Sequence, residues 1–206
     1  DPNSKLNRML DDMIRVYHDT AENEYVTDGK VDPIKGASLM LFTDIGLGEQ
    51  SAASRGFDMK GWIERRLTEG GVKPAHVAFM RDHKAHSKKE RLFDDMRRGH
   101  KRILIGGKDM ETGVNAQKRL AFLAHLDAPW FPASVEQREG RIIRQGNQNK
   151  QVAIKAYATK GSYDSTMWGM NARKARFIEQ AMSGDSSVRS MEDVSEASAF
   201  EMAAAL

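Results

Sequence analysis

The sequence contains no cysteine. This absence excludes disulfide bonds, thiolate metal sites, thiol catalysis and iron–sulfur clusters on this chain. The sequence also lacks any run close to the ~18 consecutive apolar residues that a membrane-spanning helix requires. Its first residues, Asp1-Pro2-Asn3-Ser4, do not have the basic and then apolar layout of a signal peptide. We therefore expect a cytoplasmic protein that has no membrane partner.

The net charge of the chain is small, but its charged residues are unevenly distributed along the sequence. Lys and Arg number 32 and Asp and Glu 29, which gives a net charge of +3 and a pI near 9.1. This balance permits an anionic partner without requiring one. Residues 81–119 are strongly basic, whereas the last residues are acidic and rich in Ser and Ala. We expect an N-terminal helix and loop over 1–36, a main domain with a trailing helix over 37–184, and an acidic tail or linker over 185–206.

Hydrophobic periodicity predicts alternating strands and helices. Short apolar runs bounded by Gly or Asp are typical of strands buried on both faces; they cover residues 38–43, 77–80, 103–105, 120–126 and 152–157. Apolar residues at helical spacing cover residues 5–17, 57–69, 87–98, 131–146 and 162–182. The helix predicted over 87–98 opens with a capping-box spacing at Ser87-Lys88-Lys89-Glu90. The alternation predicts an α/β domain with a mainly parallel sheet, whose functional loops follow the carboxyl ends of the strands.

The segment Gln137-Arg138-Glu139-Gly140-Arg141-Ile142-Ile143-Arg144-Gln145-Gly146 is the strongest chemical signal. On a helix, Gln137, Arg141 and Arg144 share one face. The opposite face carries Val135, Ile142 and Ile143. Two guanidinium groups side by side suit a phosphate, because they stay charged and bond its oxygens in pairs. A solvated basic face on an amphipathic helix remains the alternative.

A glycine-rich loop, residues 106–117, follows the third predicted strand. Glycines at a strand end let backbone amides approach phosphates, and Lys108, Thr112 and Asn115 add side-chain donors. Ordinary glycine loops after strands are the alternative. Gly46 and Gly48 only faintly resemble a dinucleotide loop, because the third glycine is missing.

Two further patterns carry less weight. His83 and His86 have a spacing that can hold a metal, but no third ligand lies nearby in the sequence, so we expect loop histidines and no metal site. No Walker A loop and no strand ending in an Asp-Glu pair occurs. The chain therefore has phosphate-directed arginines without a complete nucleotide site.

The order of these segments resembles the carboxy-terminal RecA-like lobe of superfamily 2 helicases, most closely the Swi/Snf-like branch. The resemblance covers roughly residues 5–182. It places residues 41–44 at motif IV, 108–117 at motif V and 137–148 at motif VI, with a stretch like D-P-W-x-N-P at 127–132. The sequence departs from the family where Asn147 separates Gly146 from Gln148, and residues 21–37 look like an insertion.

The resemblance implies a split catalytic site. The N-terminal RecA-like lobe of the same parent chain would hold ATP and Mg²⁺. Arg144 would act as arginine finger, with Arg141 as its partner on the phosphates and Gln137 as an orienting group. Gly113 and Asn115 would lie near the cleft between lobes. Contacts to the phosphates of double-stranded DNA are assigned to Thr43, Lys88, Lys89, Lys108 and Thr112.

The chain alone is accordingly not expected to hydrolyse ATP. More narrowly, the sequence resembles large phage- or plasmid-borne proteins that join such a motor to an adenine methyltransferase or an anti-restriction function. Two other hypotheses stay open: a non-catalytic nucleic-acid or phosphate-binding module, in which the Gln137, Arg141 and Arg144 face docks onto a backbone, and, less favoured, a dinucleotide enzyme built on Gly46 and Gly48.

Overall fold

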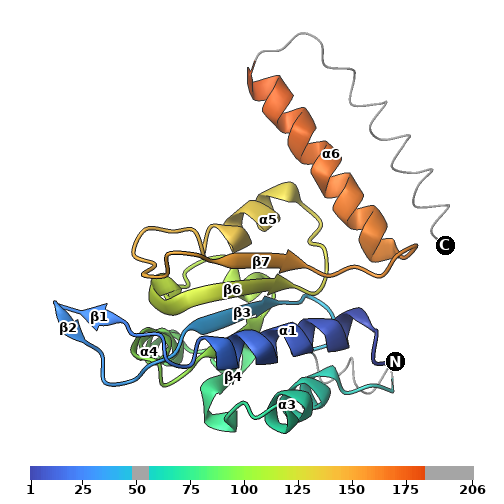
Figure 1. Cartoon of the computed structure of the whole chain (residues 1–206). Coiled ribbons are helices and arrows are strands. Elements are labelled where there is room, and N and C mark those ends of the chain that lie inside the picture. Colours follow the sequence, from blue (N-terminus) through green and yellow to red (C-terminus); the bar gives the residue numbers. More distant parts are fainter. Residues whose placement is uncertain (48–55, 184–206) are drawn as a thin grey trace. The chain divides into compact units, whose positions relative to one another are not determined.

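The computed structural model describes residues 1–47 and 56–183, with side chains up to residue 179 (Figure 1). The helices of this part are α1 (Lys5–Asp19), α3 (Met59–Glu69), α4 (His86–Arg98), α5 (Pro132–Glu139) and α6 (Tyr163–Ser183). The strands are β1 (Val26–Thr27), β2 (Lys30–Val31), β3 (Ser38–Phe42), β4 (Val77–Phe79), β5 (Ile103–Gly106), β6 (Leu120–His125) and β7 (Ala153–Ala156).

Five of the strands form one sheet in the order β4-β5-β3-β6-β7. Every neighbouring pair is parallel; Leu39, for example, lies opposite Ile103 on one side and Phe122 on the other. The predicted α/β class with a parallel sheet is therefore confirmed. Each strand of the sheet falls within one or two residues of its predicted range, because buried parallel strands read as short, continuous apolar runs.

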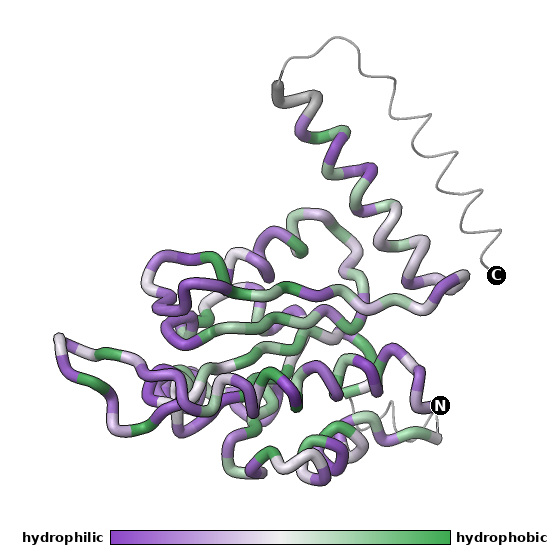
Figure 2. The backbone as a smooth tube through the Cα atoms, viewed as in Figure 1, coloured by the Kyte–Doolittle hydropathy of each residue, from purple (hydrophilic) through white to green (hydrophobic). Residues whose placement is uncertain are grey.

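Alternate residues of the strands pack into two separate cores. Leu39 and Leu41 of β3 face the core that contains α1 and α3, whereas Met40 and Phe42 face the core that contains α4. The period of two along a strand sends successive side chains to opposite faces. Figure 2 shows the resulting hydrophobic colouring of the middle strands. The central strand is thus buried on both sides, which explains why it has no polar face.

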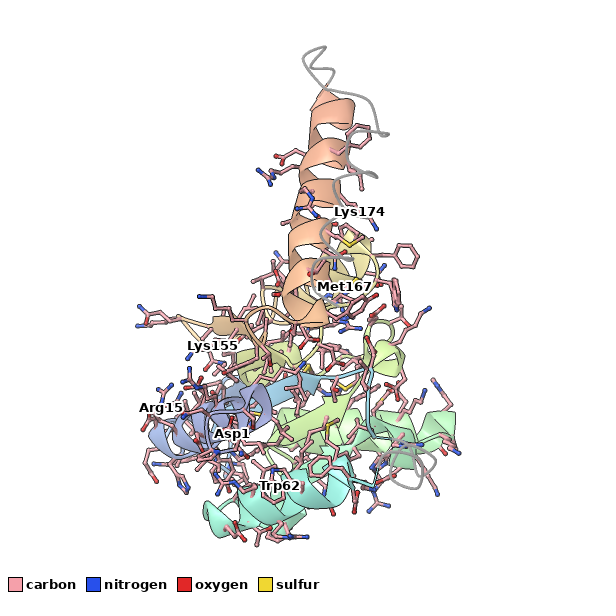
Figure 3. All side chains as sticks on the ribbon, turned by 90° about the vertical axis from the view of Figure 1, so that its right-hand side faces the viewer. Asp1, Arg15, Trp62, Lys155, Met167 and Lys174 are labelled. Atoms are coloured by element: carbon pink, nitrogen blue, oxygen red, sulfur yellow. The ribbon has the colours of Figure 1, made fainter. Side chains whose placement is uncertain are left out.

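Helix α1 is part of the same compact unit as the sheet. Ser4 caps its N-terminus by accepting a hydrogen bond from the backbone N–H of Asn7, at 3.3 Å. Asp12 binds Arg15 on the helix and Lys155 on β7, both labelled in Figure 3, at 2.7 and 2.9 Å. Burial opposes ionisation of Asp12, but hydrogen bonds from Lys155, Tyr157 and Arg15 lower its pKa to about 2.

Two compact units divide the chain. One contains Asp1–Asp127 and Gln137–Tyr157, and the other contains Ala128–Glu136 and the residues from Ala158 onward. The acidic tail predicted for 185–206 lies outside the described residues, as does the part of the Gly46 loop from Gly48 onward. Among the residues that the structure describes, no helix is long and apolar enough to span a membrane.

Helix α4 ends at Gly99 as predicted but begins differently from the capping-box prediction. Its N-cap is Ala85, which offers no side-chain hydrogen bond, so Ser87 lies inside the first turn and the predicted capping box is wrong. At the other end Gly99 adopts a left-handed φ of 89°. A Cβ at Gly99 would lie 2.4 Å from Nη1 of Arg119, so this helix stop requires glycine for space as well as for conformation.

The predicted loop over 21–37 contains a small element that the sequence did not reveal. Strands β1 and β2 pair in an antiparallel hairpin, with Val26 opposite Val31. Asp28 has a positive φ of 50° and Gly29 one of 76°, the combination that a tight two-residue hairpin turn needs. We call residues 25–34 the insertion hairpin.

Candidate functional site

The site begins at the carboxyl end of β3, where a buried carboxylate closes a turn. Asp127 accepts hydrogen bonds from the backbone N–H groups of Asp44 and Ile45, at 2.5 and 3.2 Å. It also accepts one from the hydroxyl of Thr43, at 3.1 Å. Burial raises the pKa of Asp127, although these hydrogen bonds oppose the shift. Because Thr43 is buried and already donates its proton here, its side chain is poorly placed to bind DNA.

Arg138 joins the three charged loops at this end of the sheet. Its Nε donates to Oε1 of Glu111 at 2.9 Å, and its Nη2 donates to Oδ2 of Asp44 at 2.6 Å. The guanidinium lies over the ring of Phe42, 5.1 Å from the centroid, and the side chain is 1% exposed. Arg138 therefore ties together the segments that follow β3, follow β5 and end α5. Sequence reasoning missed it, because its partners are far away along the chain.

His125 lies beside this network at the end of β6. Its ring stacks on Phe42 with centroids 5.9 Å apart, and its Nε2 lies 3.4 Å from Oε1 of Glu139. Burial, together with the nearby charge of Arg138, lowers the pKa of His125 to about 4. Burial also raises the pKa of Glu139. The imidazole is thus neutral at physiological pH and packs against the ring of Phe42.

The predicted helix over 131–146 ends much earlier, at Glu139. Gln137, Arg141 and Arg144 therefore do not share one helical face, and that prediction is wrong. Gly140 begins a series of turns in which the N–H groups of Ile142 and Ile143 both donate to the carbonyl of Glu139. The turns bury Ile142 in the core on the α4 side but leave Ile143 70% exposed, which a continuous amphipathic helix would not do.

Arg141 is held against the glycine-rich loop. Its Nη1 donates to the carbonyl of Val114 at 3.3 Å, and its Nη2 donates to the carbonyl of Glu111. Burial lowers the pKa of Arg141, and the charge of Arg144 lowers it further. The structure therefore does bring the predicted arginine segment and the predicted loop together, through backbone carbonyls rather than through a shared helix face.

Arg144 is exposed on the turn beyond Arg141. Within the described part of the chain, no hydrogen bond or ion pair engages its guanidinium. Gln137 is exposed on the last turn of α5. A fixed Arg141 next to a free Arg144 can present one ordered cationic fork to an anion.

The remaining predicted site residues are distributed over two surfaces. Lys108, Thr112, Gly113 and Asn115 are all exposed on the glycine-rich loop, where Gly113 has a left-handed φ of 73°. Lys88 is exposed and Lys89 half-buried near the start of α4. One contact links the two surfaces, since Nη1 of Arg97 on α4 donates to the carbonyl of Asn115 at 2.7 Å.

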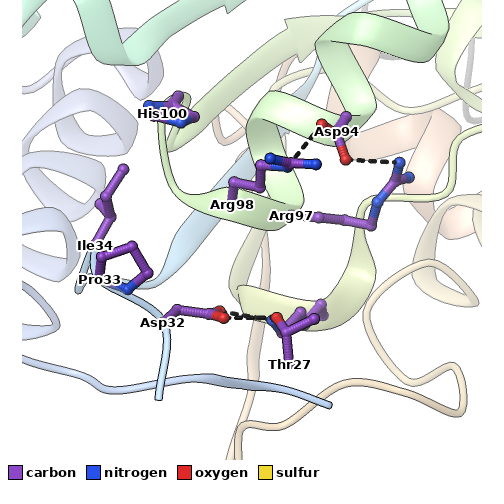
Figure 4. Close-up of a pocket in the computed structure, with 9 residues that line it drawn as sticks. Thr27, Asp32, Pro33, Ile34, Asp94, Arg97, Arg98 and His100 are labelled. Carbon is purple, nitrogen blue, oxygen red and sulfur yellow. Dashed lines mark hydrogen bonds and ion pairs between the residues drawn. The ribbon is translucent and has the colours of Figure 1, made fainter. Parts of the chain in front are cut away.

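A separate hollow of about 460 Å³ lies between the insertion hairpin and the end of α4 (Figure 4). None of the predicted site residues lines it. Arg97 and Arg98 share Asp94, at 3.4 and 2.8 Å, and Lys118 binds Asp32 at 2.6 Å. Since its cations are engaged by carboxylates, the hollow offers less to an anion than the turn at Arg144. The described residues include no group of three or more side chains placed to hold a metal ion.

A parallel five-stranded sheet flanked by helices, with charged loops gathered at the strand ends, is the RecA-like fold of a helicase C-terminal lobe. Residues 51–146 match the model of the family described as Helicase conserved C-terminal domain, a little less than half of the chain. This part of the chain is thus similar to the helicase C-terminal domain.

Individual relatives agree with this class. The chain is 35% identical over 98 residues to Defense against restriction protein B of Escherichia phage P1, across 48% of this chain but only 4% of that protein. The structure is similar to the DUF1998 helicase MrfA bound to DNA, with a TM-score of 0.55, 12% identity and coverage of 83% of this chain and 20% of that one. It is also similar to Mycobacterium smegmatis helicase Lhr bound to ssDNA and AMP-PNP, with a TM-score of 0.50, 16% identity and coverage of 90% and 20%. The chain therefore spans a small fraction of each relative, and the structural likenesses speak for the fold.

Proposed function

We propose that this chain is the second motor lobe of an ATP-dependent helicase or translocase of the Swi/Snf-like branch of superfamily 2. The exposed guanidinium of Arg144, beside an Arg141 fixed to the glycine-rich loop, is the observation that carries the proposal. An arginine that closes over the γ-phosphate from a second lobe neutralises charge in the transition state and contributes roughly 10³–10⁵ in rate.

Two lobes share the work of hydrolysis. The preceding lobe of the parent chain holds ATP and Mg²⁺, and the ion supplies charge neutralisation at the phosphates. On this chain Arg144 approaches the γ-phosphate, Arg141 is its partner on the phosphates and stays bound to the glycine-rich loop, and exposed Gln137 is an orienting hydrogen-bond group. Gly113 and Asn115 lie on the loop that Arg141 holds, so a movement of the loop is transmitted to the arginine turn.

Nucleic-acid contact falls to the exposed cations and donors. Lys108 and Thr112 on the glycine-rich loop and Lys88 and Lys89 on α4 reach the phosphates of double-stranded DNA, in contacts that are sensitive to salt and insensitive to sequence. The buried hydroxyl of Thr43 donates to Asp127 and supports its turn instead. Among the residues predicted to contact DNA, Thr43 is therefore the least suited to bind a phosphate. Opening and closing of the two lobes converts hydrolysis into stepping.

The phage relative favours a narrower setting. Its name refers to defence against restriction, and it is 35% identical to this chain over 98 residues. We propose that the parent of this chain is a large phage- or plasmid-type protein in which the motor serves an anti-restriction or DNA-methylating function. The share of that protein matched by this chain, 4%, leaves its other parts outside the comparison.

Substitution of Arg144 tests the proposal. DNA-stimulated ATP hydrolysis is measured on the intact parent chain, with Arg144→Ala compared with wild type and with Arg15→Ala, an exposed arginine on α1. We expect kcat to fall by about 10³ or more in Arg144→Ala, while binding of ATP is retained because the other lobe holds the nucleotide. Arg15→Ala keeps the activity of wild type.

The competing function is a non-catalytic module that docks onto nucleic-acid phosphates through Gln137, Arg141 and Arg144. That function requires no ATP site anywhere in the parent chain. A parent chain that hydrolyses no ATP, or an Arg144→Ala variant with unchanged kcat but weaker DNA binding, would favour the module and reject the motor.

A further inference from the structure

The turn that carries Arg144 is held at its far end by one carboxamide. Asn147 donates from Nδ2 to the carbonyls of Ile142 and Leu120, both at 2.7 Å. Its Oδ1 accepts from the backbone N–H and from Nδ2 of Asn149, both at 2.9 Å. Every donor and acceptor of this side chain is therefore engaged, and it links the turn to the start of β6. Asn147 is the residue by which the sequence departs from the family pattern.

The backbone of the turn is fixed on both sides of Arg144. Ile142, two residues earlier, is buried in the core and has its carbonyl bound by Asn147. Three residues later, the N–H of Asn147 donates to the carbonyl of Arg144 itself, at 3.3 Å. Gly146 supplies the left-handed φ of 92° that brings the chain round. Arg144 therefore lies only two residues after Ile142 and three residues before Asn147, both of which are held in place.

The insertion hairpin supports the same anchor from outside. The carboxamide of Gln148 pairs with the backbone of Val26 in both directions, at 2.8 and 2.7 Å, as a neighbouring strand would. The backbone N–H of Gln148 donates to the carbonyl of Lys118, at 2.9 Å. Tyr25, which is 2% exposed, donates its hydroxyl proton to Oδ1 of Asn149, at 2.7 Å. Asn149 thus connects the hairpin directly to Asn147.

The hairpin is itself attached to the start of β6. Arg119, which is fully buried, binds the carboxylate of Asp32 and the carbonyl of Ile34, both at 2.8 Å. Its guanidinium lies 4.8 Å from the ring centroid of Tyr25. Asp32 also binds Lys118. Because β6, the hairpin and Asn147 are bonded to one another, the arginine turn is attached to a rigid frame.

We infer that Asn147 is a positioning residue for Arg144, and that the insertion hairpin, acting through Gln148 and Asn149, is the second support of that position. The inference rests on the proposed function and extends it to residues that do not touch ATP. A guanidinium held in place before the substrate arrives loses less freedom on binding, and displacement of a reacting group by ~1 Å can cost ~10² in rate.

The test compares Asn147→Ala, Gln148→Ala and Arg144→Ala in the intact parent chain. We expect Asn147→Ala to lower kcat for DNA-stimulated ATP hydrolysis by about 10–100-fold, with KM for ATP within about twofold of wild type, since the other lobe binds the nucleotide. Gln148→Ala, which removes only the paired hydrogen bonds between this side chain and Val26 of the hairpin, gives the same pattern at about 3–10-fold. Hydrogen exchange of backbone amides in 141–149 becomes faster in both variants.

Two controls separate positioning from a loss of stability. Asn7→Ala removes a carboxamide on α1 that accepts from Trp62 and donates to the carbonyl of Asp1, and Ile63→Val trims a fully buried side chain of the core that contains α1 and α3. We expect both to keep the kcat of wild type at temperatures well below unfolding.

The outcomes distinguish this inference from the proposed function. If Arg144→Ala loses kcat but Asn147→Ala does not, or if Ile63→Val lowers kcat as much as Asn147→Ala does, the positioning role is rejected and the motor stands. If Arg144→Ala retains full kcat, the proposed function fails, and the positioning role falls with it. Unchanged hydrogen exchange at 141–149 in Asn147→Ala also rejects the positioning role.

Discussion

Arg138 shows that the local spacing of residues does not predict every residue of the site. The sequence pointed to Arg141 and Arg144, because on a predicted helix they fall on the same face as Gln137. The buried arginine is instead Arg138, whose partners Asp44 and Glu111 lie 94 and 27 residues away. Pairing over such distances is decided by the fold of the sheet, so no spacing in the sequence could reveal it. The one available signal was acidic residues after two neighbouring strands.

Removal of the Arg138 charge is expected to destabilise the protein strongly. Arg138→Met keeps much of the side-chain volume but leaves the carboxylate of Glu111, only 6% exposed, beside Asp44 with no guanidinium between them. Breaking a buried pair from one side costs about 3–5 kcal/mol, because the remaining charge has lost its solvation. We expect a loss of about 3 kcal/mol in the free energy of unfolding, measured by denaturant titration at neutral pH.

Two comparisons identify the cause. Addition of Glu111→Gln to Arg138→Met should recover part of the loss in the free energy of unfolding, since it removes the buried negative charge of Glu111. Arg15→Met breaks an ion pair with Asp12 in which the arginine is 56% exposed, and it should cost less than ~1 kcal/mol. Equal losses at Arg138 and Arg15 would mean that burial of the pair does not determine its contribution.

At the scale of elements, the sequence predicted strands better than helix ends. Strands β3, β5 and β6 are short apolar runs packed between two cores, so composition alone identifies them, whereas β7 at the sheet edge is mostly exposed. The end of α5 at Glu139 is decided by Arg138 and Ile142, which must reach different tertiary partners. The insertion hairpin was missed because Val26 and Val31 are exposed, so no buried face marks its strands; the Asp28-Gly29 pair was the one local signal of its turn. Tertiary contacts thus determine the helix ends and the exposed hairpin, which the local sequence pattern did not predict.

The start of α4 offers a gain in stability that follows from its missing cap. Ala85 has the extended φ and ψ of an N-cap, −71° and 142°, but no side-chain oxygen to accept a hydrogen bond from the first turn. Ala85→Ser supplies that acceptor and should raise the free energy of unfolding by about 1 kcal/mol. Denaturant titration measures the change.

Ser4 of α1 provides the matched reverse experiment. Its hydroxyl already accepts from the N–H of Asn7, so Ser4→Ala should lower the free energy of unfolding by about 1 kcal/mol. A loss at Ser4 without a gain at Ala85 would contradict the assignment of Ala85 as a functional N-cap position.

At the scale of the whole 206-residue chain, the net charge is too small for these residues to bind nucleic acid through their total field. A net charge of +3 over 206 residues is modest, so any affinity for DNA has to come from a local concentration of cations. The candidates are α4, with Lys88 and Lys89 near its start, and the glycine-rich loop, which the contact between Arg97 and Asn115 connects to that helix. Binding by such a surface depends on salt in proportion to the number of phosphates that it contacts.

The salt dependence therefore tests whether α4 contacts DNA. Lys88→Gln combined with Lys89→Gln should weaken binding to duplexes of different sequence by the same factor, and should reduce the slope of log K against log salt by about 2, since each phosphate contact contributes about 0.9. Lys30→Gln combined with Lys73→Gln makes the same change in net charge at exposed lysines elsewhere. This control should leave the slope within ~0.5 of wild type. If both pairs reduce the slope equally, DNA senses only the overall charge, and the contacts assigned to α4 are wrong.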